Sequence, residues 1–260
     1  MKFSIIMPSL NQRPFIEAAV RSVLDQRGEF ALELWIIDGG SRDGSTDFLR
    51  GLSDARVHWS SAPDAGQSDA VNKGLSRATG DIIGWLNSDD LYAPGALATV
   101  AEQFAAQPER PWLVGRCGIV DGEGHEVRRG ITRYKDRALR RYSFKALLRE
   151  NFISQMGVFW RRAFGQRVGP LDTTLRYTMD YDLWLRMARQ CDPLIVDCVL
   201  AQFRVHGASK SGGGVNRAQF DEDYAVARRY AGTNRMSLWV HRLNVEKIVW
   251  GYRLMRLLGR

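Results

Sequence analysis

The 260-residue sequence has few cysteines and histidines and no long apolar run. Its three cysteines are odd in number and form no Cys-x-x-Cys pair, which fits a reducing compartment and argues against a disulfide scaffold. The four scattered histidines have no zinc-site spacing. No segment of about 18 apolar residues occurs, so no membrane-spanning helix is expected. The short apolar run before Pro8 does not resemble a signal peptide.

Known phosphate-binding loops are also missing. No Gly-x-Gly-x-x-Gly follows the first expected strand, which argues against a dinucleotide-binding fold. The P-loop pattern is absent, and the glycine-rich stretch 207–214, read as a flexible loop, lacks its spacing. The sequence contains neither His-Glu-x-x-His nor Gly-x-Ser-x-Gly, so it offers no zinc-protease or serine-hydrolase motif.

Hydrophobic residues make up 45% and charged residues 25% of the chain, which is ordinary globular composition. The length suits one large α/β domain or a domain with an appendage. The net charge of +8 is concentrated in two segments: 128–149 carries +8 and 235–260 carries +5, which leaves −5 elsewhere. Such segments suit an anionic membrane surface, a phosphate-bearing substrate or nucleic acid, whereas the plain alternative is solvated helix surfaces.

Hydrophobic patterning predicts strands that alternate with helices in the first half of the chain. The expected strands are 3–7, 32–37, 57–59 and 81–86, and the expected helices are 14–26, one from about 45, and 68–79. This order implies βαβ units and a mainly parallel sheet. The second half predicts strands at 112–115, 117–120, 156–160 and within 193–203, and helices at 143–149, 181–190, 219–230 and 238–258. The basic stretch 128–149 is expected to be a loop leading into its last helix.

Polar or acidic loops follow three of the expected strands, at Ser9–Asn11, Asp38 and Asp89–Asp90. Because ligands of open α/β sheets bind beyond the carboxyl ends of the strands, these loops are expected to form one site. The adjacent carboxylates of Asp89 and Asp90 repel each other, and a divalent cation carrying phosphate oxygens would compensate them. The alternative is that the pair caps a following helix.

Six segments, in order along the chain, resemble motifs of family 2 glycosyltransferases of the GT-A fold, of the type that builds bacterial cell-envelope polysaccharides. They are 6–11, 36–45, 64–74, 87–90, 179–184 and 203–207. The resemblance covers roughly residues 3–211. It implies a Rossmann-like, mostly parallel central sheet flanked by helices. We expect a catalytic domain at 1–214, with a donor half at 1–110 and an acceptor half at 111–214, followed by a C-terminal helical extension at 215–260.

The resemblance also implies a nucleotide-diphosphate sugar donor, with UDP favoured, and Mn²⁺ or Mg²⁺ as cofactor. Asp90 would hold the metal with His206, while Asp89 would bind ribose or sugar hydroxyls. Asp38 would accept a hydrogen bond from the base, and its alternative role is that of a turn residue before two glycines. The remaining expected donor residues are Pro8, Ser9, Leu10, Asn11, Asp64, Gly66, Asn72 and Lys210. Lys210 would neutralise diphosphate charge.

On the acceptor side, Asp180 is expected to be the general base that deprotonates the attacking hydroxyl. Single displacement would then invert the anomeric configuration. Related sequences often have Glu-Asp here, whereas this chain has Met179-Asp180, so any acceptor contact by that glutamate is in doubt. Asp182 is expected to cap the following helix. Gln155 is expected to touch the acceptor, a glycan or lipid-linked glycan, unless it is only a strand-edge residue.

The C-terminal segment 235–260 combines tryptophans with arginines and is similar to an interfacial membrane anchor. Its alternative role is packing on the catalytic domain or on a partner subunit, which would permit a homodimer. The expected location is cytoplasmic, with peripheral attachment to the inner face of the cell membrane and no nucleic-acid partner. Two rival functions remain: a non-catalytic nucleotide-sugar-binding assembly subunit, and a nucleotidyltransferase, which would normally show a basic phosphate loop.

Overall fold

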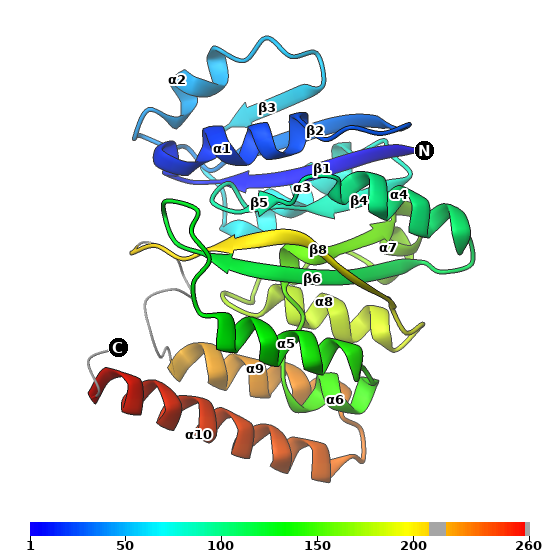
Figure 1. Cartoon of the computed structure of the whole chain (residues 1–260), viewed down its shortest axis with the longest axis vertical. Coiled ribbons are helices and arrows are strands. Elements are labelled where there is room, and N and C mark those ends of the chain that lie inside the picture. Colours follow the sequence, from blue (N-terminus) through cyan, green and yellow to red (C-terminus); the bar gives the residue numbers. More distant parts are fainter. Residues whose placement is uncertain (208–216, 258–260) are drawn as a thin grey trace.

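The computed structural model describes residues 1–207 and 217–257, which form one mixed sheet covered by helices on both faces (Figure 1). Its strands are β1 (Lys2–Ser9), β2 (Ala31–Asp38), β3 (Val57–Ser61), β4 (Ile82–Trp85), β5 (Leu91–Tyr92), β6 (Trp112–Val120), β7 (Val158–Arg161) and β8 (Leu194–Arg204). They are arranged in the order β3-β2-β1-β4-β7-β6-β8-β5. Strands β3, β2, β1 and β4 are parallel, as the alternating pattern predicts.

The second half of the sheet is mixed rather than simply parallel. Strand β7 runs antiparallel to both β4 and β6, and β5 runs antiparallel to β8, whereas β6 and β8 are parallel. The two strands expected at 112–115 and 117–120 are one strand, β6, whose register against β8 shifts around Arg116. Gly115 permits this close pairing, because a Cβ there would lie 2.3 Å from Leu200 Cδ1.

The first half contains four helices, and three of them correspond to expected helices. They are α1 (Arg13–Leu24), α2 (Ser45–Arg50), α3 (Gln67–Arg77) and α4 (Ala96–Ala106). The second half adds α5 (Arg129–Arg140), α6 (Phe144–Arg149), a 3-10 turn (Gln155–Gly157), α7 (Arg162–Val168), α8 (Met179–Ala188), α9 (Arg217–Tyr230) and α10 (Arg235–Leu257). Neither α4 nor α7 has a counterpart among the expected elements.

The expectation that 128–149 begins as a loop is wrong, because α5 occupies most of it. The buried residues of α5 are Thr132, Asp136 and Leu139, at helical spacing. Two of the three are polar, so the inward face carries little of the apolar periodicity by which a helix is recognised in a sequence. Asp136 can be buried because it forms an ion pair with Arg116 of β6.

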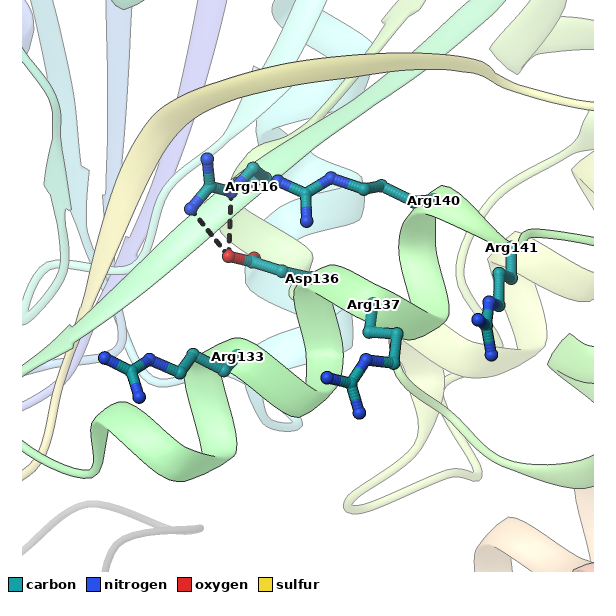
Figure 2. A pocket seen from close by; sticks show the side chains of 6 residues that line it. All are labelled: Arg116, Arg133, Asp136, Arg137, Arg140 and Arg141. Atoms are coloured by element: carbon teal, nitrogen blue, oxygen red, sulfur yellow. Dashed lines mark hydrogen bonds and ion pairs between the residues drawn. The ribbon is translucent and has the colours of Figure 1, made fainter.

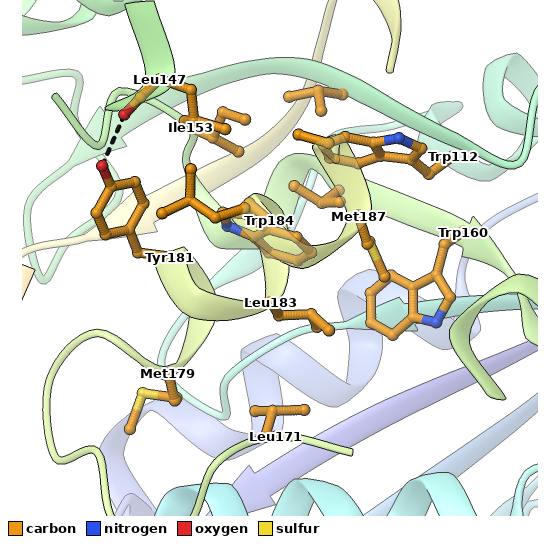
Figure 3. Close-up of a cluster of buried hydrophobic side chains, with 14 of the residues drawn as sticks. Trp112, Leu147, Ile153, Trp160, Leu171, Met179, Tyr181, Leu183, Trp184 and Met187 are labelled. Atoms are coloured by element: carbon orange, nitrogen blue, oxygen red, sulfur yellow. Dashed lines mark hydrogen bonds between the residues drawn. The ribbon is translucent and has the colours of Figure 1, made fainter. Parts of the chain in front are cut away.

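Two apolar clusters hold the helices onto the sheet. One lies between the sheet and α1 and α4, through residues such as Ile16, Val20 and Phe104. The other joins the opposite face to α3, α5, α6, α8 and α9. Figure 3 shows its centre, where the buried rings of Trp112 and Trp160 flank Trp184 at centroid distances of 6.2 and 6.1 Å.

The C-terminal helices pack on the second half of the chain rather than standing apart from it. Val226 and Ala227 of α9 are fully buried in the second cluster. His241 of α10 is buried, and its Nδ1 lies 3.0 Å from the carbonyl oxygen of Leu148 in α6. The outer side of α10 exposes large apolar side chains, namely Met236, Trp239, Leu243 and Trp250. Among the helices in the described ranges, none has the length and apolarity needed to cross a bilayer.

We expect Trp184→Ala to lower the free energy of unfolding by about 3–5 kcal/mol, because it empties a fully buried ring site. Trp239→Ala is the matched control: its side chain is 60% exposed, so the change should stay within about 0.5 kcal/mol. Urea denaturation of both variants measures the difference. Equal destabilisation by the two substitutions would contradict this description of the core.

Candidate active site

The loops that follow β1 and β2 are bonded to each other at the carboxyl edge of the sheet. The backbone N–H of Gly39 donates to the carbonyl of Ser9 at 2.8 Å. Asn11 adopts a left-handed backbone with φ 54°, and its side-chain oxygen accepts the N–H of Arg42 at 2.9 Å. Pro8 and Ser9 are buried at the end of β1, whereas Leu10 is 53% exposed. The structure therefore brings the expected base-binding residues together beside the second loop.

Asp38 lies at the end of β2 and is 1% exposed. One carboxylate oxygen accepts the backbone N–H groups of Gly40 and Ser41 at 3.0 and 2.9 Å and the hydroxyl of Ser61 at 2.6 Å. The other oxygen accepts the hydroxyl of Ser41. Asp38 therefore builds the turn, which was the alternative reading of this residue. Its role toward a nucleotide base stays a prediction, and Oδ1, which accepts one hydrogen bond from the described residues, has capacity for a second donor.

Asp64 and Gly66 lie next to this turn. A Cβ at Gly39 would lie 2.8 Å from Asp64 Oδ2, so the carboxylate sits directly against that glycine. The other oxygen of Asp64 accepts the N–H of Gly66 at 2.8 Å. Gly66 has φ 112°, a conformation that side chains disfavour, and α3 begins at the next residue.

Asn72 is held by the fold at the next turn of α3. Its side chain donates to the carbonyl of Leu171 at 3.0 Å and accepts the N–H of the same residue at 2.9 Å. These bonds give Asn72 a structural role and leave its second amide hydrogen for the predicted donor contact. Lys73 forms an ion pair with Asp69 at 2.7 Å, as expected for a solvated helix turn.

Asn87, just beyond β4, connects the donor loops to the second half of the chain. Its oxygen accepts from Gln67 at 2.8 Å and from the indole of Trp85 at 3.0 Å. Its nitrogen donates to Asp90 Oδ2 and to Gln155 Oε1, each at 3.1 Å. The amide of Gln155 in turn donates to the carbonyl of Trp85. All hydrogen-bonding atoms of this amide are thus used within one network.

Asp90 is completely buried inside this network. Its second oxygen accepts the backbone N–H of Arg204 at 2.9 Å. Burial raises the pKa of the Asp90 carboxyl well above its usual range, and the charge of Asp89 adds to the effect. The alternative that this pair caps a helix is wrong, because β5 follows it directly and α4 begins only at Ala96.

The end of β8 supplies the neighbours of the carboxylate pair. His206 Nε2 lies 3.1 Å from Asp89 Oδ2. The imidazole packs on Phe15 of α1 with ring centroids 4.2 Å apart, and the guanidinium of Arg204 lies over the same ring at 5.0 Å. Phe15 therefore holds both the histidine and the arginine beside Asp89.

The donor chemistry of these side chains suits a divalent cation. Carboxylate oxygens and an imidazole nitrogen are ligands that Mn²⁺ accepts. A bound cation would also compensate the negative charges of Asp89 and Asp90, which repel each other. Within the described residues, however, no three His, Cys, Asp or Glu side chains are already gathered around one point. The phosphate oxygens of a donor would have to complete such a site.

Asp180 lies in the first turn of α8, which begins at Met179, two residues earlier than the expected start at residue 181. Its Oδ1 accepts the backbone N–H of Tyr181 at 2.7 Å. Burial raises the pKa of Asp180 from 3.8 to about 6, and Lys135 lessens the effect. The expectation that Asp182 caps this helix is wrong: Asp182 is buried, forms an ion pair with Arg186 at 2.9 Å and accepts the hydroxyl of Tyr230 at 2.6 Å.

The segment before Asp180 is held by a residue of α9. Glu222 accepts the backbone N–H groups of Arg176, Tyr177 and Thr178 at 3.0, 2.7 and 2.8 Å. The hydroxyl of Thr178 donates to the same carboxylate at 2.9 Å. A carboxylate in this position satisfies free N–H groups at the start of α8 and stabilises the positive end of the helix dipole. Glu222 therefore fixes the chain immediately before Asp180.

Asp223, the next residue of α9, is buried, and its Oδ1 has no hydrogen-bond partner within the described part of the chain. Burial, together with the charges of Asp180 and Glu222, raises the pKa of Asp223 well above its usual range. Sequence reasoning missed Asn87, Glu222 and Asp223. Asn87 stood within a recognised motif, but the two acids of α9 carry no local signal. Lys210 lies outside the described residues.

A parallel first half, a mixed second half and acidic loops at the carboxyl edge of the sheet define the GT-A fold class. The model of the family "Glycosyl transferase family 2" matches residues 4–168. An uncharacterized glycosyltransferase of Mycobacterium tuberculosis is 28% identical over 208 residues, covering 78% of this chain and 75% of that protein. A PGL/p-HBAD biosynthesis glycosyltransferase of Mycobacterium bovis is 33% identical over 190 residues, covering 71% and 68%. The chain belongs to glycosyl transferase family 2 and is a glycosyltransferase.

Solved structures show the same fold at low sequence identity. The crystal structure of S. aureus TarS 1-349 has a TM-score of 0.66 and 17% identity, covering 89% of this chain, which spans 64% of the TarS chain. The mannosyltransferase PcManGT of Pyrobaculum calidifontis, solved with GDP-Man and Mn²⁺, has a TM-score of 0.61 and 16% identity, covering 93% and 73%.

We expect Asp180→Asn to stabilise the folded protein above pH 6. The raised folded-state pKa means that the wild-type carboxyl contributes stability below pH 4 that is lost as the pH rises through about 6. The neutral amide avoids this loss, so the variant should gain about 1–3 kcal/mol at pH 8 and almost nothing near pH 4. Urea denaturation across this range measures the gain, with the exposed Asp25→Asn as control. A gain independent of pH would contradict this environment.

Proposed function

We propose that this enzyme transfers a sugar from a nucleotide-diphosphate donor, with UDP favoured, to a hydroxyl group of a glycan or lipid-linked glycan, with inversion. The observation that carries the proposal is the Asn87 amide, which hydrogen-bonds Asp90 on the donor side and Gln155 on the expected acceptor side. TarS has also been solved in complex with UDP-GlcNAc, and PcManGT with GDP-Man, which supports a nucleotide-sugar donor without choosing between the two nucleotides.

The donor is proposed to lie across the carboxyl edge of β1, β2 and β4. Asp38 and Asp64 flank the base, Asp89 binds ribose or sugar hydroxyls, and Gly66 allows the backbone to approach the donor closely. Asp90 and His206 would hold Mn²⁺ or Mg²⁺. When bound, the cation supplies Lewis-acid stabilisation of the departing diphosphate, so no separate general acid is required. Arg204 lies beside the carboxylate pair and lowers the cost of its negative charge.

Asp180 is proposed to accept the proton of the attacking hydroxyl. A carboxylate with a pKa of about 6 is mostly ionised at neutral pH and is a stronger base than an ordinary aspartate. The hydrogen bond from the backbone of Tyr181 fixes one of its oxygens, which leaves the other available for the acceptor. Gln155 would orient that acceptor from the other side of the Asn87 network. Attack on the anomeric carbon from the side opposite the diphosphate then gives inversion.

We expect the full chain to bind a nucleotide-diphosphate sugar in the presence of Mn²⁺ or Mg²⁺ and to hydrolyse it slowly without acceptor. Calorimetric titration against UDP- and GDP-sugars measures binding, and nucleotide release measures turnover. Asp90→Asn should weaken metal-dependent binding by at least about tenfold, because a charged ligand is lost. Asp180→Asn should leave binding intact and lower turnover by about 10²-fold or more. Binding with no turnover in the wild type would favour an assembly subunit, and no binding of any donor would refute the proposal.

The outer face of α10 is proposed to rest on an anionic membrane at the cytoplasmic side. Its exposed apolar side chains include Met236 and Trp239, and the exposed cations Arg235, Arg242 and Lys247 lie on the same helix. The inner face is already covered by α6 and α9. Removing the whole helix would therefore uncover the faces of α6 and α9 on which it packs, as well as delete the anchor.

We expect the pair Met236→Ser and Trp239→Ser to reduce co-sedimentation with anionic vesicles severalfold while the protein stays folded, because both side chains are more than half exposed. Val199→Ser, an exposed apolar residue of β8, is the control and should not alter binding. Unchanged sedimentation of the α10 double variant would show that this face does not contact the membrane.

A further inference from the structure

An open groove of about 390 Å³ runs along α5 and is lined almost entirely by arginines. The lining residues are Arg116, Arg133, Asp136, Arg137, Arg140 and Arg141. A second groove of about 380 Å³ shares Arg116, Arg133 and Asp136 with the first and continues it toward Glu126, Arg129 and Thr132. Figure 2 shows Arg116 and Arg140 close together, while Arg133 and Arg137 project from successive turns of α5 and Arg141 follows its last residue. None of these residues belongs to the donor site described above.

Only part of this positive charge is balanced by the protein. Asp136 binds Arg116 through Nε and Nη2 at 2.8 and 2.7 Å. Asp197 of β8 accepts from Nε and Nη2 of Arg140 at 3.1 and 3.0 Å. The ion pair with Asp136 raises the pKa of Arg116, which keeps this guanidinium charged. The two carboxylates therefore fix two of the arginines in place.

Three arginines of the groove remain without a partner. Within the described part of the chain, Arg133, Arg137 and Arg141 make no hydrogen bond or ion pair through their guanidinium groups. They follow one another at intervals of four residues: Arg133 and Arg137 share one face of α5, and Arg141 caps its C-terminal end. Like charges at this spacing destabilise an isolated helix. The sequence thus maintains an unfavourable row of cations at the surface.

The continuation of the groove contains an unused polar group. Thr132 is 8% exposed, and its hydroxyl is buried without a hydrogen-bond partner among the described residues. Arg129 at the same end is paired with Glu126 at 2.9 Å. Leaving a buried hydroxyl unsatisfied costs free energy, which a ligand oxygen in the groove would recover.

We propose that the α5 groove is a binding site for a phosphate-bearing anion. Planar guanidinium groups match phosphate oxygens with paired hydrogen bonds, and three uncompensated charges favour a group with more than one negative charge. Two sources offer this chemistry: the diphosphate of a phosphorylated acceptor, and the headgroups of anionic lipids. Binding at the groove does not depend on the proposed sugar transfer.

The groove also lies on the helix that faces the expected base. Lys135, between the groove residues of α5, lowers the raised pKa of Asp180, and its Nζ lies 3.4 Å from the hydroxyl of Ser154 next to Gln155. A phosphate group bound to the outer face of α5 would therefore contact the same helix whose Lys135 lies near Gln155 and Asp180. This placement suits the anionic part of an acceptor whose hydroxyl reaches Asp180.

The test compares two triple variants of the full chain. The groove variant carries Arg133→Gln, Arg137→Gln and Arg141→Gln, and the control carries Arg27→Gln, Arg50→Gln and Arg167→Gln, which remove equal charge from exposed sites elsewhere. The probes are inorganic pyrophosphate, vesicles of phosphatidylcholine with phosphatidylglycerol, and vesicles of phosphatidylcholine alone. Circular dichroism confirms that each variant is folded. The Asp90→Asn variant is included because pyrophosphate that binds in the donor site, rather than in the groove, should bind this variant more weakly.

We expect the groove variant to bind at least one anionic probe about tenfold or more weakly than wild type, while the control triple stays within about twofold. Loss toward pyrophosphate, with Asp90→Asn unaffected, identifies a soluble diphosphate as the ligand. Loss toward anionic vesicles alone identifies lipid headgroups. Equal binding of both anionic probes by wild type and groove variant would overturn the proposal, as would equal loss in the control triple.

Discussion

The side-chain amide of Asn87 is the interaction on which the site depends. It accepts from the donor-side helix α3 and from Trp85, and it donates to Asp90 and Gln155. An amide has two donor hydrogens and one acceptor oxygen, and this environment uses all of them. Because the group is mostly enclosed, exchanging any one partner would leave a buried polar atom unpaired. The network therefore adds side-chain hydrogen bonds to the backbone pairing of β4 with β7, which joins the two halves of the sheet.

The acceptor side is organised by electrostatics rather than by hydrogen bonds alone. Asp180 and Asp223 both interact with the charge of the Lys135 amine, and the charge of Glu222 acts on both acids. Glu222 remains ionised because four donors surround it, and its pKa is lowered accordingly. Among the described residues, Oδ1 of Asp223 has no donor, and burial raises the pKa of this carboxyl well above its usual range. Glu222 thus positions the start of α8, while burial raises the pKa of both Asp223 and Asp180, the proposed base.

Much of the donor half could be predicted from the sequence, since its strands alternate with helices whose apolar periodicity is clear. The second half was less accessible. Helix α5 escaped detection because Thr132 and Asp136 face inward and depend on Arg116, a residue of a distant strand. The roles of Asp38 and Asn72 show a further limit: a motif names a polar residue, but only the fold shows which backbone groups already occupy it. The functional roles of these site residues stay predictions.

Glu222 also changes how the chain is divided. The family match ends at residue 168, yet the carboxylate that holds the start of α8 comes from α9, about 45 positions farther along than the backbone it binds. The C-terminal helices thus cover the core and also carry a charge that acts on Asp180, the proposed base. In chimeras that combine the donor half of one relative with the C-terminal helices of another, the pH optimum of sugar transfer should be that of the relative that supplies the C-terminal helices.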